Sequence, residues 1–150
     1  MGGRTLGQVK PQMAFVDSNI IIFANVETYP EYPKALELIE RGLKGEFTIC
    51  FNTITALEAH YKLLRALGAD EARYRIRALF ESRGTLYFDV SKDTVLKGAE
   101  LTKKYETDRL RTNDAVIAAS MLENNIKTIY TDNEKDFRKI LDLKVINPLK

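Results

Sequence analysis

Five acidic residues occupy the positions expected of a shared site: Asp17, Glu58, Asp114, Asp132 and Asp136. In open parallel sheets, ligands bind beyond the carboxyl ends of the strands, where the strand order reverses. Asp17 and Asp132 follow the first and fourth predicted strands, so we expect them in one crevice if those strands are neighbours. Asp136 lies one helical turn after Asp132, on the same face. Glu58 and Asp114, near two helix N-termini, are placed to line the crevice from its sides.

Carboxylates that share one pocket repel one another and do not all stay ionised without a cation between them. Hard oxygen ligands with no supporting histidine or cysteine cluster suit Mg²⁺ or Mn²⁺ better than zinc. In phosphodiester hydrolysis such ions activate a water molecule and neutralise charge on the phosphate. Since the sequence offers acidic ligands and no obvious nucleophile, it indicates hydrolysis by metal-activated water.

Two of these acids also have a structural interpretation in helix capping. Thr55 and Glu58 have the spacing of a capping box, and so do Thr131 and Glu134. Asp132 then falls in the first turn of the second of these helices, where a negative charge favours the helix dipole. Spacing alone explains Glu58 equally well as a cap or as a ligand, and it favours the structural role for Asp132.

The remaining acids differ in how well a structural role explains them. Asp114 could simply complement a helix dipole in a first turn. Asp17 follows the apolar Phe15 and Val16 and precedes another apolar run over 20–24, so it lies near the edge of the core and needs a partner. The case for a site therefore depends on the whole set of acids.

Strands and helices alternate along the chain and must position these residues. Apolar runs predict strands over 13–16, 47–51, 85–90, 127–131 and 144–147. Helical periodicity and capping residues predict helices over 20–24, 33–43, 55–67, 70–81, 91–101, 114–122 and 132–140. In the third of these helices, an apolar stripe of Leu57, Tyr61, Leu64 and Leu67 is expected to face the core. The alternation predicts an α/β fold, with a parallel sheet between layers of helices.

Composition bounds the class of protein. The chain has 150 residues, 45% of them hydrophobic, which suits one domain over 13–150 preceded by a flexible tail over 1–12. The formal charge of +2 is too balanced to indicate nucleic acid by itself. No apolar run is long enough to span a membrane, and the first residues do not resemble a signal peptide. The single cysteine, Cys50, lies in a predicted buried strand and fits a reducing cytoplasm.

Four segments, in this order, resemble the motifs of the PIN-domain family: Val16-Asp17-Ser18-Asn19-Ile20, Thr55-x-x-Glu58, Asn113-Asp114-Ala115-x-Ile117-Ala118-Ala119 and Thr131-Asp132-Asn133-x-x-Asp136-Phe137. The match covers nearly the whole chain, from Met13 to Pro148. The resemblance implies a three-layer α/β/α fold with a five-stranded parallel sheet. It also implies single-strand-selective nuclease chemistry with Mg²⁺ or Mn²⁺.

The resemblance implies roles for individual acids. Asp17, Asp114 and Asp132 match the acids that hold the metal. Glu58 matches an acid that holds it directly or through water, and Asp136 matches a more variable fifth acid. All the principal acids of the pattern are present, so the resemblance implies an active enzyme.

Neutral and basic neighbours of these acids have supporting roles in the same interpretation. Thr131, with Ser18 or Asn19, would orient the carboxylates through hydrogen bonds, as the outer partners of metal ligands do. Arg109 and Arg111 precede Asp114 and would hold RNA phosphates without reading sequence. Because acidic residues are interleaved with the basic ones in this region, an ordinary solvated surface explains the two arginines better.

In length, the chain is most similar to the VapC-type toxins of this family, which implies an RNA substrate, an antitoxin partner, often a homodimer, and no membrane association. PIN domains also occur in RNA maturation and decay, and a housekeeping nuclease or a non-catalytic binding module stays open as an alternative. A haloacid-dehalogenase-like phosphatase is disfavoured because Asn19 stands where it needs a second aspartate. A receiver domain is disfavoured because Asp89 lies inside a predicted strand. The single histidine, His60, lies on a different helical face from Glu58 and is expected to be structural or exposed.

Overall fold

The computed structural model describes residues 12–140 and 142–150, so the tail expected over 1–12 lies outside the described residues except for Gln12. Five parallel strands form one sheet in the order β3-β2-β1-β4-β5. They are β1 (Gln12–Val16), β2 (Phe47–Asn52), β3 (Thr85–Phe88), β4 (Thr128–Tyr130) and β5 (Lys144–Ile146). The strand order reverses between β1 and β4, which are neighbours, as the placement of the acids required.

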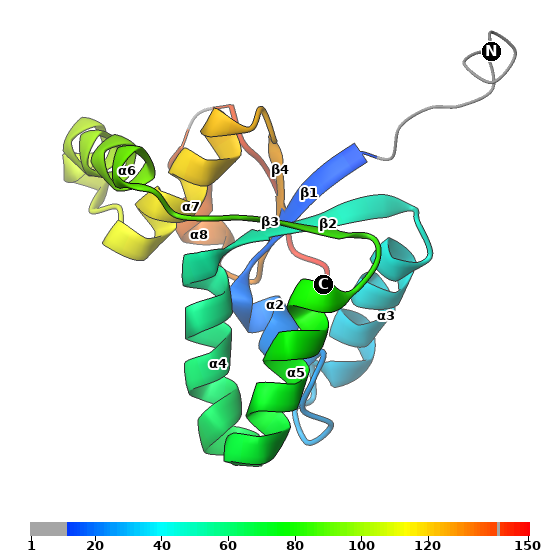
Figure 1. Cartoon of the computed structure of the whole chain (residues 1–150). Coiled ribbons are helices and arrows are strands. Elements are labelled where there is room, and N and C mark those ends of the chain that lie inside the picture. The colour runs from blue at the N-terminus through cyan, green and yellow to red at the C-terminus, as the bar shows by residue number, and fades with distance from the viewer. Residues whose placement is uncertain (1–11, 141) are drawn as a thin grey trace, which may run out of the picture.

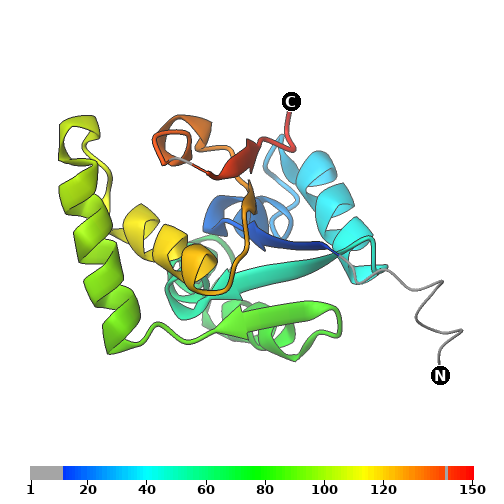
Figure 2. The ribbon, with the colours of Figure 1, turned by 90° about the horizontal axis from the view of Figure 1, so that it is seen from above.

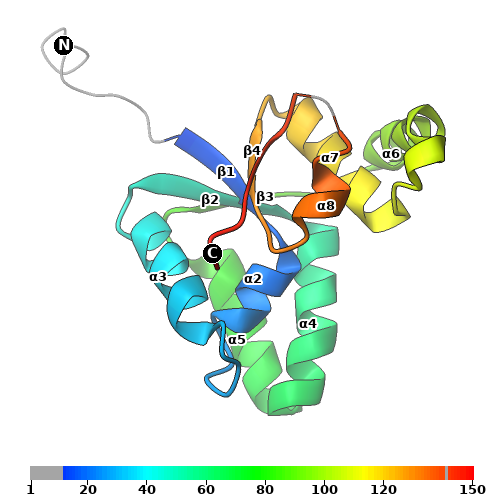
Figure 3. The same cartoon turned by 180° about the vertical axis from the view of Figure 1, so that it is seen from behind.

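Helices cover both faces of the sheet, as Figures 1 and 3 show from opposite sides. On one side lie α2 (Ser18–Phe23), α3 (Tyr32–Leu43), α4 (Thr53–Leu67) and α5 (Ala69–Glu81). On the other lie α6 (Lys92–Lys104), a 3₁₀ turn (Glu106–Asp108), α7 (Thr112–Glu123) and α8 (Glu134–Phe137). Viewed from above, α6 lies outside α7, and α3 lies at the opposite end of the molecule (Figure 2). The α/β/α prediction with a five-stranded parallel sheet is confirmed.

The central strand is buried on both faces because it contributes side chains to two separate cores. Ala14 and Val16 pack with α2 to α5, whereas Phe15 packs with α6 to α8. Cys50 of β2 is fully buried in the second core, as its apolar surroundings predicted. A strand buried on both sides has a continuous apolar sequence rather than an alternating one, which explains why short apolar runs located the strands.

Both expected capping boxes are wrong. Asn52 caps α4 by accepting from the backbone N–H of Thr55 at 2.9 Å, so the helix begins two residues before Thr55. At the second position, the helix begins only at Glu134 and ends at Phe137, shorter than the expected 132–140. Thr131 there binds other groups, described below. By contrast, Ser91 caps α6, as its position predicted.

Three of the four apolar residues that were expected to face the core from α4 instead face outward, whereas Leu67 is partly buried and packs against the core. Leu57, Tyr61 and Leu64 are 64%, 59% and 40% exposed. The buried side of α4 consists largely of smaller side chains, including Ala56 and Ala59, because small residues let α4 pack closely against its neighbours. No helix among the described residues is long and apolar enough to cross a membrane.

Candidate active site

Three carboxylates line one hollow of about 370 Å³. Asp17 directly follows β1, Glu58 lies in the second turn of α4, and Asp114 lies in the first turn of α7. We call this cavity the acidic hollow; its complete lining is Asp17, Ser18, Asn19, Glu58, Lys62, Arg111, Thr112, Asn113, Asp114 and Asn133. The fold thus brings together acids that are far apart in the sequence.

Asp17 is held rigidly at the end of β1. Its Oδ2 accepts a 2.8 Å hydrogen bond from the hydroxyl of Thr131, and its Oδ1 accepts one of 2.8 Å from the backbone N–H of Ser18. Burial raises the pKa of Asp17 to about 6, despite these two hydrogen bonds, and the charges of Glu58 and Asp132 raise it further. Such a carboxylate stays ionised at neutral pH but gains strongly from a nearby cation.

Asp114 would gain more than Asp17 from a nearby positive charge. Its side-chain Oδ2 is buried and has no hydrogen-bond partner among the described residues. Burial raises the pKa of Asp114 to about 7, and the charges of Asp17, Asp136 and Glu58 raise it as well, partly offset by Arg111. Because an unpaired buried carboxylate oxygen is costly, a cation at this position would stabilise it.

Glu58 faces the acidic hollow because Asn52 has taken over the capping of α4. The Glu58 Oε2 atom accepts a 2.9 Å hydrogen bond from the side-chain amide of Asn113, the residue next to Asp114. Neither asparagine was assigned a role from the sequence, although Asn113 stands in one of the four motifs. An asparagine between a strand and a helix is a typical N-cap, so Asn52 carried a readable signal. The contact between Asn113 and Glu58 joins residues 55 positions apart and had none.

Asp132 lies beside the acidic hollow rather than in its lining. Its Oδ1 accepts a hydrogen bond from the side-chain amide of Asn19, which does line the hollow. Burial raises the pKa of Asp132, with a further rise from Glu31 and an opposing effect of Lys62. Asp132 also borders an adjacent hollow of about 530 Å³ formed with Asn133, Glu134, Lys135, Arg138 and Lys150.

Asp136 is occupied by cationic side chains. Its Oδ1 accepts a 2.9 Å hydrogen bond from Lys139, and its Oδ2 lies 4.0 Å from Arg111. The hydrogen bond from Lys139 lowers the pKa of Asp136, so the group is ionised and already paired. Of the two arginines singled out from the sequence, Arg111 lines the acidic hollow, whereas Arg109 ends the 3₁₀ turn in a left-handed conformation.

The donor chemistry of the acidic hollow fits a hard divalent cation. Its carboxylates offer oxygen atoms, two of them have raised pKa values, and the buried Asp114 Oδ2 and Asn19 Oδ1 both have no partner among the described residues. In that same part of the chain, no three acidic, histidine or cysteine side chains already form a group that could hold a metal ion. The acids therefore line the same hollow, but in this conformation they do not form a complete set of metal ligands.

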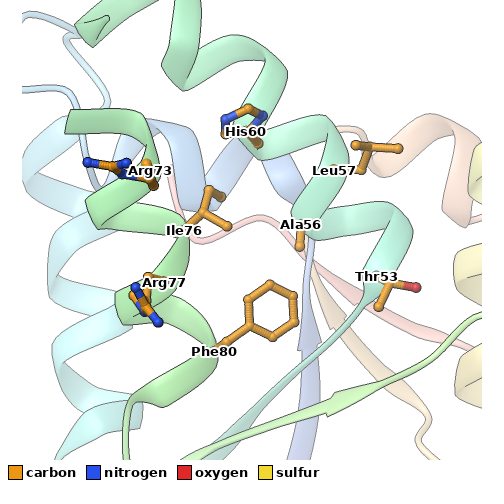
Figure 4. A pocket seen from close by; sticks show the side chains of 8 residues that line it. All are labelled: Thr53, Ala56, Leu57, His60, Arg73, Ile76, Arg77 and Phe80. Atoms are coloured by element: carbon orange, nitrogen blue, oxygen red, sulfur yellow. The ribbon is translucent and has the colours of Figure 1, made fainter. Parts of the chain in front are cut away.

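Another hollow, of about 470 Å³, lies between α4 and α5, and none of the five acids lines it (Figure 4). Ile76 and Phe80 of α5 face Ala56 of α4 there, and Arg73 and Arg77 lie on the α5 side. His60 lines this hollow and not the acidic one, in line with the expectation that it is structural or exposed. The lining of the hollow between α4 and α5 is predominantly apolar and includes no carboxylate among the described residues.

The comparisons with known proteins agree with this fold. The PIN domain family model matches residues 14–142, a span that contains all five acids. A structure of the toxin VapC20 from Mycobacterium tuberculosis, described as cleaving the sarcin-ricin loop, is 16% identical, with a TM-score of 0.71, covering 87% of this chain and 98% of that one.

Two further similar structures come from toxin–antitoxin complexes. A chain of VapBC-1 from nontypeable Haemophilus influenzae is 22% identical, with a TM-score of 0.69, and the alignment covers 93% of this chain and 100% of that one. A chain of VapBC2 from Rickettsia felis, bound to a promoter DNA fragment, is 23% identical, with a TM-score of 0.67 and coverage of 91% and 98%. At these identities the likeness concerns the fold. No curated protein matches the chain significantly.

Proposed function

Because the chain belongs to the PIN-domain family, we propose that it is a metal-dependent endoribonuclease and the toxin of a VapBC-type toxin–antitoxin pair. The observation that carries the proposal is the acidic hollow, where Asp17, Glu58 and Asp114 meet and one oxygen of Asp114 is buried without a partner. Such a cluster of acids is unfavourable by itself and is relieved by a bound cation.

We assign Asp17, Glu58 and Asp114 as the side chains that would hold Mg²⁺ or Mn²⁺. Asp132 would act from beside the hollow, where Asn19 holds it, and Asp136 would mainly place Arg111. A bound divalent cation would supply an activated water and neutralise charge on the scissile phosphate. Thr131 and the backbone N–H of Ser18 keep the Asp17 carboxylate oriented.

The rim of the acidic hollow carries two cationic side chains that suit an RNA backbone. Lys62 comes from α4, and Arg111 precedes α7. Both would contact phosphate oxygens and thereby hold the strand without reading its sequence. We therefore retain Arg111 as a phosphate contact, add Lys62, and leave Arg109 out because it does not line the hollow.

Cleavage of single-stranded RNA tests the proposal. The wild-type protein should cleave in Mg²⁺ or Mn²⁺ and stop when EDTA is added, and Asp17→Asn should be inactive. Asp70→Asn is the matched control, because Asp70 has a 99% exposed side chain on α5 and lies outside the acidic hollow. Cleavage that survives both EDTA and Asp17→Asn would eliminate the proposed chemistry.

The toxin assignment is supported by similar solved structures from VapBC complexes. We propose a protein antitoxin as partner, a homodimer as the assembly, and the cytoplasm as the place of action, since the RNA substrate is there. Light scattering should give twice the 17.1 kDa chain mass.

Expression alone should arrest growth, and co-expression of the reading frame adjacent in the genome should relieve the arrest. Cleavage without toxicity would instead favour an RNA-processing nuclease.

A further inference from the structure

Tyr61 is an exposed aromatic side chain beside the acidic hollow. It lies on α4, three residues after Glu58 and therefore on the same side of the helix. Tyr61 is 59% exposed, although its spacing predicted a place in the core. An aromatic ring this exposed, next to a cluster of acids, is available to a ligand.

The surroundings of Tyr61 connect it to the acidic hollow. The ring borders a smaller hollow of about 260 Å³, which we call the Tyr61 hollow, together with Ser18, Leu57, Glu58 and Lys62. Three of these residues, Ser18, Glu58 and Lys62, also line the acidic hollow, so the two cavities adjoin. An RNA strand with one phosphate at the acidic hollow would place its next nucleotide at the Tyr61 hollow.

Two basic side chains accompany the ring. The guanidinium carbon of Arg65 lies 5.8 Å from the centre of the Tyr61 ring, and its Nη1 donates to the Tyr61 hydroxyl at 3.4 Å. Lys62 extends from the next position of α4 to the rim shared by both hollows. An aromatic ring for the base and cations for the backbone are the combination that proteins use to bind single-stranded nucleic acids.

We infer that Tyr61 stacks on a base of single-stranded RNA next to the scissile phosphodiester, while Lys62 and Arg65 hold the flanking phosphates. The inference rests on the proposed ribonuclease function, because it takes the acids as the point of cleavage. A protein partner could also cover Tyr61 and the neighbouring Leu57. The two basic side chains that accompany the ring, Lys62 and Arg65, and the continuity with the acidic hollow favour RNA.

Fluorescence anisotropy with labelled single-stranded RNA tests this inference. Ca²⁺ replaces Mg²⁺, since it accepts oxygen ligands with looser geometry, and gels of the same samples establish that the RNA stays intact. Tyr61→Ala should weaken binding about tenfold, within the range known for base stacking, and Tyr61→Phe should retain the affinity. Tyr74→Ala is the matched control, because Tyr74 is 63% exposed on α5.

An abasic oligonucleotide of the same length separates stacking from charge. It should bind the wild type and Tyr61→Ala equally, because it keeps the phosphates and lacks the bases. A tenfold loss on both oligonucleotides, an equal loss in Tyr74→Ala, or dissociation of an oligomer by Tyr61→Ala in light scattering would overturn the inference. Unchanged RNA affinity in Tyr61→Ala, with intact metal-dependent cleavage by the wild type, would overturn stacking alone. Absence of cleavage by the wild type would overturn the proposed function as well.

Discussion

The hydroxyl of Thr131 donates a 2.8 Å hydrogen bond to Oδ2 of Asp17, although the two residues are 114 positions apart in the sequence. Thr131 follows β4, Asp17 follows β1, and the two strands pair directly. The same hydroxyl oxygen accepts from the backbone N–H of Asn133 at 2.9 Å, ahead of α8. One buried threonine therefore fixes both the carboxylate and the adjoining loop.

Replacing Thr131 should lower both RNA cleavage and stability, because its hydroxyl makes two of the hydrogen bonds that hold the site together. Thr131→Val keeps the volume but removes the donor to Asp17 and the acceptor for Asn133, so the pKa of Asp17 should rise further. We expect RNA cleavage to fall roughly 10- to 100-fold at neutral pH, as for other outer partners of metal ligands. Loss of the buried hydrogen bonds should cost about 1–3 kcal/mol in urea unfolding. Thr131→Ser should restore both; an active Thr131→Val would show that the hydrogen bond is dispensable.

The metal-free protein should become less stable as the pH rises through the range in which its buried acids ionise. The pKa values of Asp17 and Asp114 are about 6 and about 7 in the folded chain, against an ordinary value of 3.8. Their protonated forms therefore stabilise the fold fully below pH 3.8, and this contribution is lost as the pH rises through 6 to 7.

Asp114→Asn isolates this effect, because the amide does not titrate. Urea unfolding in EDTA at pH 5 and pH 8 should show a larger fall in wild-type stability than in the variant. The shift of Asp114 corresponds to about 4 kcal/mol at most. Added Mg²⁺ at pH 8 should stabilise the wild type and not Asp114→Asn, since binding to the folded state alone raises stability. Parallel pH dependences would contradict the burial argument.

Asn52 should matter for both stability and activity. It is fully buried, caps α4 through Thr55, and donates to the Ser120 hydroxyl at 3.0 Å. Asn52→Ala should destabilise the protein by about 2–3 kcal/mol and lower RNA cleavage, because the start of α4 also places Glu58. Ser91→Ala removes the cap of α6 instead; it should cost about 1 kcal/mol and leave cleavage unchanged. Equal effects of the two variants on cleavage would contradict this role of Asn52.

The sequence was sufficient for the strands and for the placement of Asp17 beyond one of them, because buried parallel strands have distinctive apolar runs. It could not choose between Asn52 and Thr55 as the cap of α4, since both residue types cap helices and the long-range contact of Asn52 with Ser120 cannot be read from the sequence. It also misplaced Tyr61, because hydrophobicity favours large side chains for the core. The buried side of α4 instead contains Ala56, Ala59 and Leu63.

Anomalous diffraction from a crystal soaked in Mn²⁺ tests the central claim most directly, because it locates the ion independently of any activity. The account predicts one strong peak in the acidic hollow, within coordinating distance of Asp17 and of the Asp114 oxygen that now has no partner among the described residues. The peak should disappear in Asp114→Asn crystals soaked in the same way. A wild-type crystal at saturating Mn²⁺ with no peak between these carboxylates, or with an unchanged peak in the variant, would contradict the account.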